Sequence, residues 1–306
     1  MIVLKGSFEH LKIIEKSSIA LGTFDGVHLG HQSIISRAVE EAHKRHLKSV
    51  VFTFTEPVFT YFNQRSKNYL ITSENVKTEI IKNLNVDYLV YVELNYKFLS
   101  LSPDDFLKYL KSNFNVQVIV CGFNYTFGNK AAGDVNFLKE NAQKYGIDSI
   151  IVDEIEVDKQ KVSSSIIRQY LSKGNVELAN NLLGYNYYLK GIVTRGKRLA
   201  SRLGFATANI YIEKNLCLKN GVYLTVTKLG EKYYPSISNV GYNPTFNEVL
   251  RVCETHILDF SEDIYNKDIK VEFKKYLRNE IKFNSLEELK RQIKNDVKIA
   301  RNYFRL

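Results

Sequence analysis

The sequence predicts an α/β domain followed by an antiparallel β-barrel with a C-terminal helix, and three observations support this fold class. Up to about residue 150, short apolar runs alternate with stretches of helical periodicity, as in a parallel sheet with crossover helices. Beyond about Tyr187, short segments rich in β-branched and aromatic residues are separated by turn residues, as in a barrel. The 306 residues are enough for two domains with separate cores.

The α/β half begins with a buried strand that ends at Leu21. A helix follows, in which apolar residues recur at helical spacing from Ile34 to Ala42. The helix from Pro103 is well marked, because Ser102 can cap it and proline is favoured at the first helical position. Further strands are expected at 50–54, 88–92, 117–121 and 149–152, and helices at 74–84, 103–114 and 135–145.

The second half is expected to contain short strands and a closing helix. The strands are predicted at 189–194, 222–227, 233–240, 252–259 and 269–274. Ser285 and Glu288 form a capping-box pair at the start of the helix. Its apolar stripe, which should pack across the barrel, consists of Leu286, Leu289, Ile293, Val297 and Ala300. Residues 184–188 are the predicted linker between the two halves.

Residues 22–31, GTFDGVHLGH, place two histidines three apart at the expected strand-to-helix turn. Helix N-termini attract anions, and Gly26 and Gly30 let a phosphate approach the main chain. His28 and His31 can donate hydrogen bonds to phosphate oxygens as charge builds in a transition state. A zinc site is disfavoured, because no third or fourth ligand lies nearby at metal spacing. The motif therefore predicts a phosphate-binding site.

A second constellation lies in residues 191–209, GIVTRGKRLASRLGFATAN. A loop rich in glycine and cations can hold a polyphosphate, and the oxygens of Thr207 and Asn209 suit Mg²⁺. The alternative is a basic loop that faces solvent. Downstream, Glu254 and His256 are two apart and so share one strand face, which supplies a carboxylate able to accept a hydroxyl proton.

Several of these segments resemble the bacterial bifunctional riboflavin kinase/FAD synthetases, a branch of the HxGH nucleotidyltransferases. GTFDGVHLGH is similar to their GxFDGxHxGH signature, CGFNYTFG (121–128) to their flavin-side loop, and SSSIIR (163–168) to their SSTxIR phosphate motif. In the second half, GFATAN, NVGYNPTF (239–246), ETHILDF (254–260) and LRNEIKFNSLEELKRQI (277–293) resemble signatures of the kinase module.

The resemblance implies a Rossmann-like FAD synthetase (FMN adenylyltransferase) domain over 1–184 and a six-stranded antiparallel riboflavin kinase barrel over 185–306. It implies riboflavin, FMN, FAD and ATP as ligands and Mg²⁺ as the metal. The implied catalytic residues are Glu254, the base for the ribityl hydroxyl, and His28 and His31. The implied nucleotide-binding residues are Gly22, Phe24, Asp25, Gly26, Gly30, Ser164, Arg168, Gly191, Gly196, Lys197, Thr207 and Asn209. Asn124, Phe127 and Arg278 are the implied flavin-binding residues, and Thr207 and Asn209 the implied metal ligands.

This chain departs from the family pattern mainly in the second phosphate loop. Ala206 replaces a proline, and Ala200-Ser201 stands where the family carries Gly-Arg. In the first half, Asn124 replaces an aspartate and Ser165 a threonine. Two alternatives follow: an FAD synthetase whose impaired kinase module only binds flavin, or another HxGH adenylyltransferase, such as one acting on nicotinamide mononucleotide or pantetheine phosphate.

Composition narrows the class of protein further. The net charge is +10, but the lysines are spread along the chain without a basic stripe, so we expect small-molecule partners and no nucleic-acid or membrane partner. A flavin-sensing or RNA-binding regulator is the non-enzymatic alternative. Three distant cysteines predict reduced thiols and a cytoplasmic location. Neither a signal peptide nor a membrane span is expected, and the sequence leaves the oligomeric state open.

Overall fold

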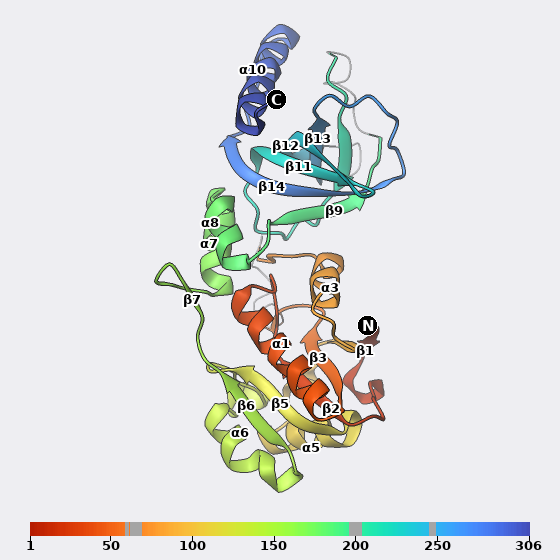
Figure 1. Ribbon diagram of the computed structural model, residues 1–306, viewed down its shortest axis with the longest axis vertical. Helices are drawn as coiled ribbons and strands as arrows, with labels where there is room; N and C mark the ends of the chain where they lie inside the picture. The colour runs from red at the N-terminus through yellow and green to blue at the C-terminus, as the bar shows by residue number, and fades with distance from the viewer. Residues whose placement is uncertain (59–60, 62–68, 196–203, 245–248) are drawn as a thin grey trace. The chain divides into compact units, whose positions relative to one another are not determined.

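The computed structural model describes residues 1–58, 61, 69–195, 204–244 and 249–306 (Figure 1). The chain forms two compact units. The first contains Met1–Ser66 and Lys77–Ser164, and the second contains Lys67–Val76 and Ser165–Leu306. The boundary expected between residues 184 and 185 stays a prediction.

The first unit is built on a six-stranded parallel sheet, which confirms the predicted α/β class. Its spatial order is β1 (Ile2–Gly6), β4 (Tyr88–Val92), β3 (Lys48–Phe54), β2 (Ser17–Leu21), β5 (Val116–Gly122) and β6 (Asp148–Val152). The order reverses between β2 and β5, and ligands of open α/β sheets bind at the carboxyl ends of the strands that flank such a switch point. The turn after Leu21 and the loop after Gly122 both lie there.

Helices pack on this sheet through the apolar faces that the sequence marks. Helix α1 (Leu29–Lys44) contacts β2, β3 and β5 (Figure 1). Helix α5 (Pro103–Phe114) is capped by Ser102 as predicted, since Ser102 Oγ accepts the Asp105 N–H at 3.1 Å. The unit also contains α3 (Glu74–Lys82) from Lys77 onward, α4 (Tyr96–Leu99), α6 (Val135–Asn141), the 3-10 turns Phe8–His10, Asn129–Ala131 and Ala142–Tyr145, and the hairpin of β7 (Glu156–Val157) and β8 (Gln160–Lys161).

The second unit joins two helices to a nearly closed antiparallel barrel. The helices are α7 (Ser164–Lys173) and α8 (Val176–Leu183). The strand order is β10 (Ala208–Tyr211), β13 (Val249–Ile257), β12 (Lys232–Pro244), β11 (Gly221–Leu229), β14 (Asp268–Arg278) and β9 (Tyr188–Ile192). A bridge between Thr194 and Asn209 draws the two sheet edges together. Helix α10 (Leu286–Phe304) contacts β12, as expected for a helix across the barrel.

Local details differ from the sequence expectations. Asn209 lies in β10, a four-residue strand that the sequence did not reveal, because its length is too short for a periodic signal. The expected linker contains Tyr187 and Tyr188, which are buried at the start of the barrel. Ser285 caps α10 as predicted, but the Glu288 carboxylate accepts the Asn284 N–H at 3.0 Å, one residue before the cap.

Candidate functional site

The turn between β2 and α1 has an unusual backbone. Phe24, Gly26 and Val27 have positive φ values of 49°, 80° and 35°. A β-branched residue such as Val27 rarely adopts this conformation, and such strain persists only where the surroundings enforce it, typically at functional sites. Gly22 is required by packing, because a Cβ there would lie 2.9 Å from the Phe24 ring.

Both predicted histidines lie at the N-terminus of α1. His28 is the N-cap, and its Nδ1 accepts the His31 N–H at 3.3 Å. An accepting Nδ1 leaves the proton of a neutral imidazole on Nε2, so His28 presents Nε2–H as its donor. The two rings stack with centroids 3.6 Å apart, and a Cβ at Gly30 would come within 3.2 Å of the His28 ring. The structure thus brings together two imidazoles at a helix N-terminus.

Two further predicted residues of the first unit contact each other. Asp25 is 4% exposed, and its carbonyl oxygen accepts a hydrogen bond from Ser164 Oγ at 3.0 Å. Ser164 therefore holds the main chain of the turn. Arg168 belongs to the second unit, where its Nε donates to the Tyr69 carbonyl at 2.6 Å, and its role at a phosphate stays a prediction.

The loop after β5 carries the two flavin-binding residues predicted in this half, and they differ in exposure. Asn124 is exposed, whereas Phe127 is 7% exposed and its ring packs 5.3 Å from Phe106 in the core. Phe127 therefore fixes the loop through packing. The sequence reasoning did not single out Phe123, which is 44% exposed beside Asn124. Its flat apolar surface makes it an additional candidate for a flavin contact.

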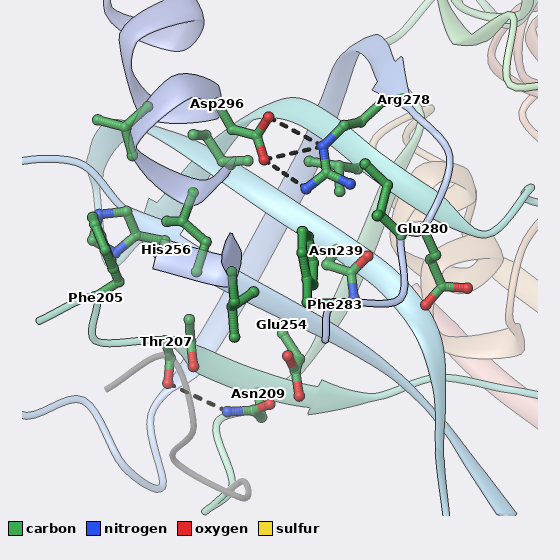
Figure 2. Close-up of a pocket in the computed structure, with 16 residues that line it drawn as sticks. Phe205, Thr207, Asn209, Asn239, Glu254, His256, Arg278, Glu280, Phe283 and Asp296 are labelled. Atoms are coloured by element: carbon green, nitrogen blue, oxygen red, sulfur yellow. Dashed lines mark hydrogen bonds and ion pairs between the residues drawn. The ribbon is translucent and has the colours of Figure 1, made fainter. Parts of the chain in front are cut away.

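A cavity of about 280 Å³ in the second unit is lined by Thr207, Asn209, Glu254 and His256 of the second constellation (Figure 2). Glu254 lies on β13 directly opposite Asn209 of β10 and Asn239 of β12. Residues directly opposite in a sheet point to the same face, so the three side chains form a polar row. His256 lies on the same face, and its Nδ1 is 2.8 Å from the Ala206 carbonyl oxygen.

The donor set at one end of this cavity fits a hard cation. Asn209 is 5% exposed, its Nδ2 donates to the Thr207 carbonyl at 3.3 Å, and its Oδ1 has no hydrogen-bond partner among the described residues. A buried amide oxygen without a partner is costly unless a ligand occupies it. Thr207 lies beside it (Figure 2). Oxygen ligands of this kind suit Mg²⁺.

The described part of the chain gives no support for a phosphate contact at the other predicted residues of this loop. Gly191 lies in β9, where a Cβ would come 3.2 Å from the Ile210 side chain, so packing explains the glycine. Gly196 and Lys197 lie outside the described residues, as do the departures at Ala200 and Ser201. Their roles stay predictions.

The opposite end of the cavity is defined by a partly buried ion pair between Arg278 and Asp296. Arg278 at the end of β14 donates from Nη2 to Asp296 Oδ2 at 2.7 Å and from Nε to both carboxylate oxygens at 3.1 Å. Glu280 follows, and burial raises its pKa, as does the charge of Glu254, while a hydrogen bond from Asn239 opposes the shift. Asn239 and Glu280 lie in the motifs that resemble the kinase module, but the sequence does not single them out as site residues, and Asp296 lies outside those motifs, because only the tertiary fold brings these side chains into the cavity of Glu254.

No group of three or more histidine, cysteine, aspartate or glutamate side chains that could hold a metal ion occurs in the described part of the chain. No helix within the same residues has the length and hydropathy needed to span a membrane.

Comparison with known proteins defines the class of each half. Residues 10–166 match the FAD synthetase family, and residues 183–304 match the riboflavin kinase family. The fold is therefore that of a nucleotidyltransferase domain and a kinase barrel on one polypeptide. The chain belongs to the family of bifunctional riboflavin kinase/FMN adenylyltransferases.

Curated relatives with that name cover nearly the whole chain. The protein of Bacillus subtilis is 37% identical over 295 residues, covering 94% of this chain and 93% of the relative. That of Buchnera aphidicola from Schizaphis graminum is 32% identical over 311 residues and covers 100% of both. A solved structure described as a macrolide-efflux protein from Streptococcus pneumoniae superposes with a TM-score of 0.85 at 30% identity, covering 99% of both chains. The family matches agree with the curated relatives rather than with that description.

Proposed function

We propose that this chain makes both flavin nucleotides. The second unit transfers the γ-phosphoryl group of ATP to riboflavin and yields FMN and ADP, and the first unit transfers the adenylyl group of ATP to FMN and yields FAD and pyrophosphate. The observation that carries the proposal is the presence of two separate polar sites, each inside a region that matches the corresponding family.

Adenylyl transfer requires stabilisation of charge on the nucleotide phosphates. The FMN phosphate attacks the α-phosphorus of ATP in line, and pyrophosphate leaves without a covalent enzyme intermediate. The amides of the turn at 22–28, the N-terminus of α1, His28 Nε2–H and His31 supply donors at this position. Ser164 keeps the turn in place, and we assign Arg168 to the nucleotide phosphates.

Phosphoryl transfer requires a base for the ribityl 5′-hydroxyl. Glu254 is half-buried in the polar row of the cavity and is the carboxylate that accepts this proton. The oxygen then attacks the γ-phosphorus, and ADP leaves. Arg278, oriented by Asp296, lies at the far end of the same cavity and is assigned to the flavin. Positioning and electrostatics supply most of the rate in such reactions.

We assign Mg²⁺ to Thr207 and Asn209. Bound there with ATP, the ion would neutralise charge on the phosphates as the γ-phosphoryl group moves. Asn209 Oδ1 is the buried acceptor that supports this assignment.

Two single variants test the assignment of one reaction to each site. Glu254→Gln should abolish FMN formation from riboflavin and leave FAD formation from FMN intact, whereas His31→Ala should do the reverse. Chromatography of riboflavin, FMN and FAD, with either flavin supplied, measures both reactions. Loss of both activities in either folded variant contradicts two independent sites.

A further inference from the structure

A lysine that the family resemblance does not assign lies under the phosphate-binding turn. Lys77, on α3, is 7% exposed. Its Nζ donates to the Thr23 carbonyl oxygen at 2.7 Å and to Thr53 Oγ1 at 2.7 Å, and it lies 3.5 Å from the Phe54 carbonyl oxygen. Thr53 Oγ1 donates in turn to the same Thr23 carbonyl at 2.8 Å. Two donors therefore converge on one carbonyl of the turn.

Holding a carbonyl also fixes the amide that follows it. In a planar trans peptide the C=O and the next N–H point in opposite directions, and the described residues contain no cis peptide. A Thr23 carbonyl that is drawn toward Lys77 therefore directs the Phe24 N–H to the opposite side of the turn. The turn is strained at Phe24, so its conformation depends on such external contacts.

Side chains also donate hydrogen bonds to two more carbonyl oxygens of the turn. Ser164 Oγ donates to the Asp25 carbonyl at 3.0 Å, and Gln32 Nε2 donates to the Val27 carbonyl at 2.8 Å. By the same geometry, these contacts direct the N–H groups of Gly26 and His28. Three alternate N–H groups of one turn, those of Phe24, Gly26 and His28, are thus each held from the carbonyl side, and backbone N–H groups fixed in a turn can bind an anion.

We propose that Lys77 is a positioning residue for adenylyl transfer, which orients the phosphate-binding turn through the Thr23 carbonyl. This inference rests on the proposed adenylyltransferase activity of the first unit. Burying an ammonium group is costly unless hydrogen bonds compensate, and two of the hydrogen bonds that Lys77 donates end on the Thr23 carbonyl and on Thr53 Oγ1, which itself donates to that carbonyl. Its placement beneath a polyphosphate site also adds a fixed positive charge where negative charge accumulates.

The test is Lys77→Met, which keeps the length of the side chain and removes its donors and charge. Lys82→Met on the same helix is the matched control, because Lys82 is exposed. A displacement of about 1 Å at a reacting group can cost about 100-fold, so we expect kcat/KM for FAD formation from FMN to fall roughly 100-fold, mostly through kcat. FMN formation from riboflavin in the same chain should stay unchanged, as should both activities of Lys82→Met.

A second variant separates positioning from folding. In Lys77→Ala, added n-propylammonium can fill the space and restore a cationic donor, so the rate of FAD formation should rise with amine concentration while that of wild type does not. Hydrogen exchange of β5 reports whether the first unit is folded. If Lys77→Met loses β5 protection, the folded variant Lys77→Gln, which keeps a neutral amide donor on a shorter side chain, should still lose FAD formation selectively.

Failure of the proposed function and failure of the Lys77 role give different results. Wild-type protein that makes no FAD from FMN overturns the proposed function itself. Wild-type activity together with a folded Lys77→Met or Lys77→Gln variant within about threefold of wild type, a loss well below that expected for a misplaced donor, overturns the role of Lys77 alone. A rate in Lys77→Ala that does not respond to amine also overturns it.

Discussion

Replacing Asp296 by asparagine removes the negative charge that faces Arg278 in the second-unit cavity. Three contacts from Arg278 and one from Gln292 Nε2, at 2.9 Å, end on this carboxylate. The Asp296 side chain is 5% exposed and that of Arg278 is 20% exposed. Breaking a buried pair by removing one partner costs about 3–5 kcal/mol, and the residual exposure of Arg278 favours the lower end. A cost of about 3 kcal/mol shifts the docking equilibrium of α10 more than 100-fold.

The assay is urea unfolding combined with hydrogen exchange of α10. Tyrosine near-ultraviolet dichroism is the natural optical probe, because the chain has no tryptophan. Asp259→Asn is the control: Asp259 pairs with Arg301 of the same helix but is 63% exposed, so its loss should cost under about 1 kcal/mol. The double variant Arg278→Met/Asp296→Leu should recover most of the stability while losing riboflavin affinity. Equal destabilisation by Asp296→Asn and Asp259→Asn would refute the reasoning.

Two further predictions concern the barrel. Thr225→Val removes a buried hydroxyl that lies 2.9 Å from both Ser236 Oγ and Ser238 Oγ, so it should lower the free energy of unfolding by about 1–2 kcal/mol. Thr225→Ser keeps the hydroxyl and loses only a buried methyl group, so it should cost no more than about 1 kcal/mol; denaturant titration measures both. The pKa of Glu280 is raised in the folded state by burial and by Glu254, so its stabilising contribution is complete below its unfolded pKa and is lost as pH rises through the folded value. Glu280→Gln should therefore raise Tm relative to wild type at pH 7 but not at pH 4, and an equal shift at both would contradict this.

The parts of the fold that the sequence predicted are those with strong local signals. The apolar run before Leu21 and the helical repeat after it indicated β2 and α1, and the Ser102–Pro103 signature located the start of α5. By contrast, β1 is an edge strand with exposed residues such as Ile2, so it lacks a burial pattern. Strand β10 is too short to show one.

The site residues that the sequence predicted also lie in local motifs, whereas those that it missed depend on tertiary contacts. His28, His31 and Glu254 lie in contiguous motifs, so residue type and spacing indicated them. Lys77 is 54 residues from Thr23 along the chain and reaches it only through the docking of α3. Glu280 follows the end of β14, so it comes near Glu254 of β13 only when β14 pairs with β11 and β11 with β12 in the barrel sheet. Such groups depend on tertiary register, which local sequence patterns do not encode.

The most direct test of two independent sites in one chain is complementation between the two inactivated proteins. Glu254→Gln alone should make no FMN or FAD from riboflavin, and His31→Ala alone should stop at FMN. Mixed together with riboflavin, ATP and Mg²⁺, the two proteins should produce FAD, because FMN released by one is adenylylated by the other. A mixture that accumulates FMN without FAD, under conditions in which wild type forms FAD, would contradict the account.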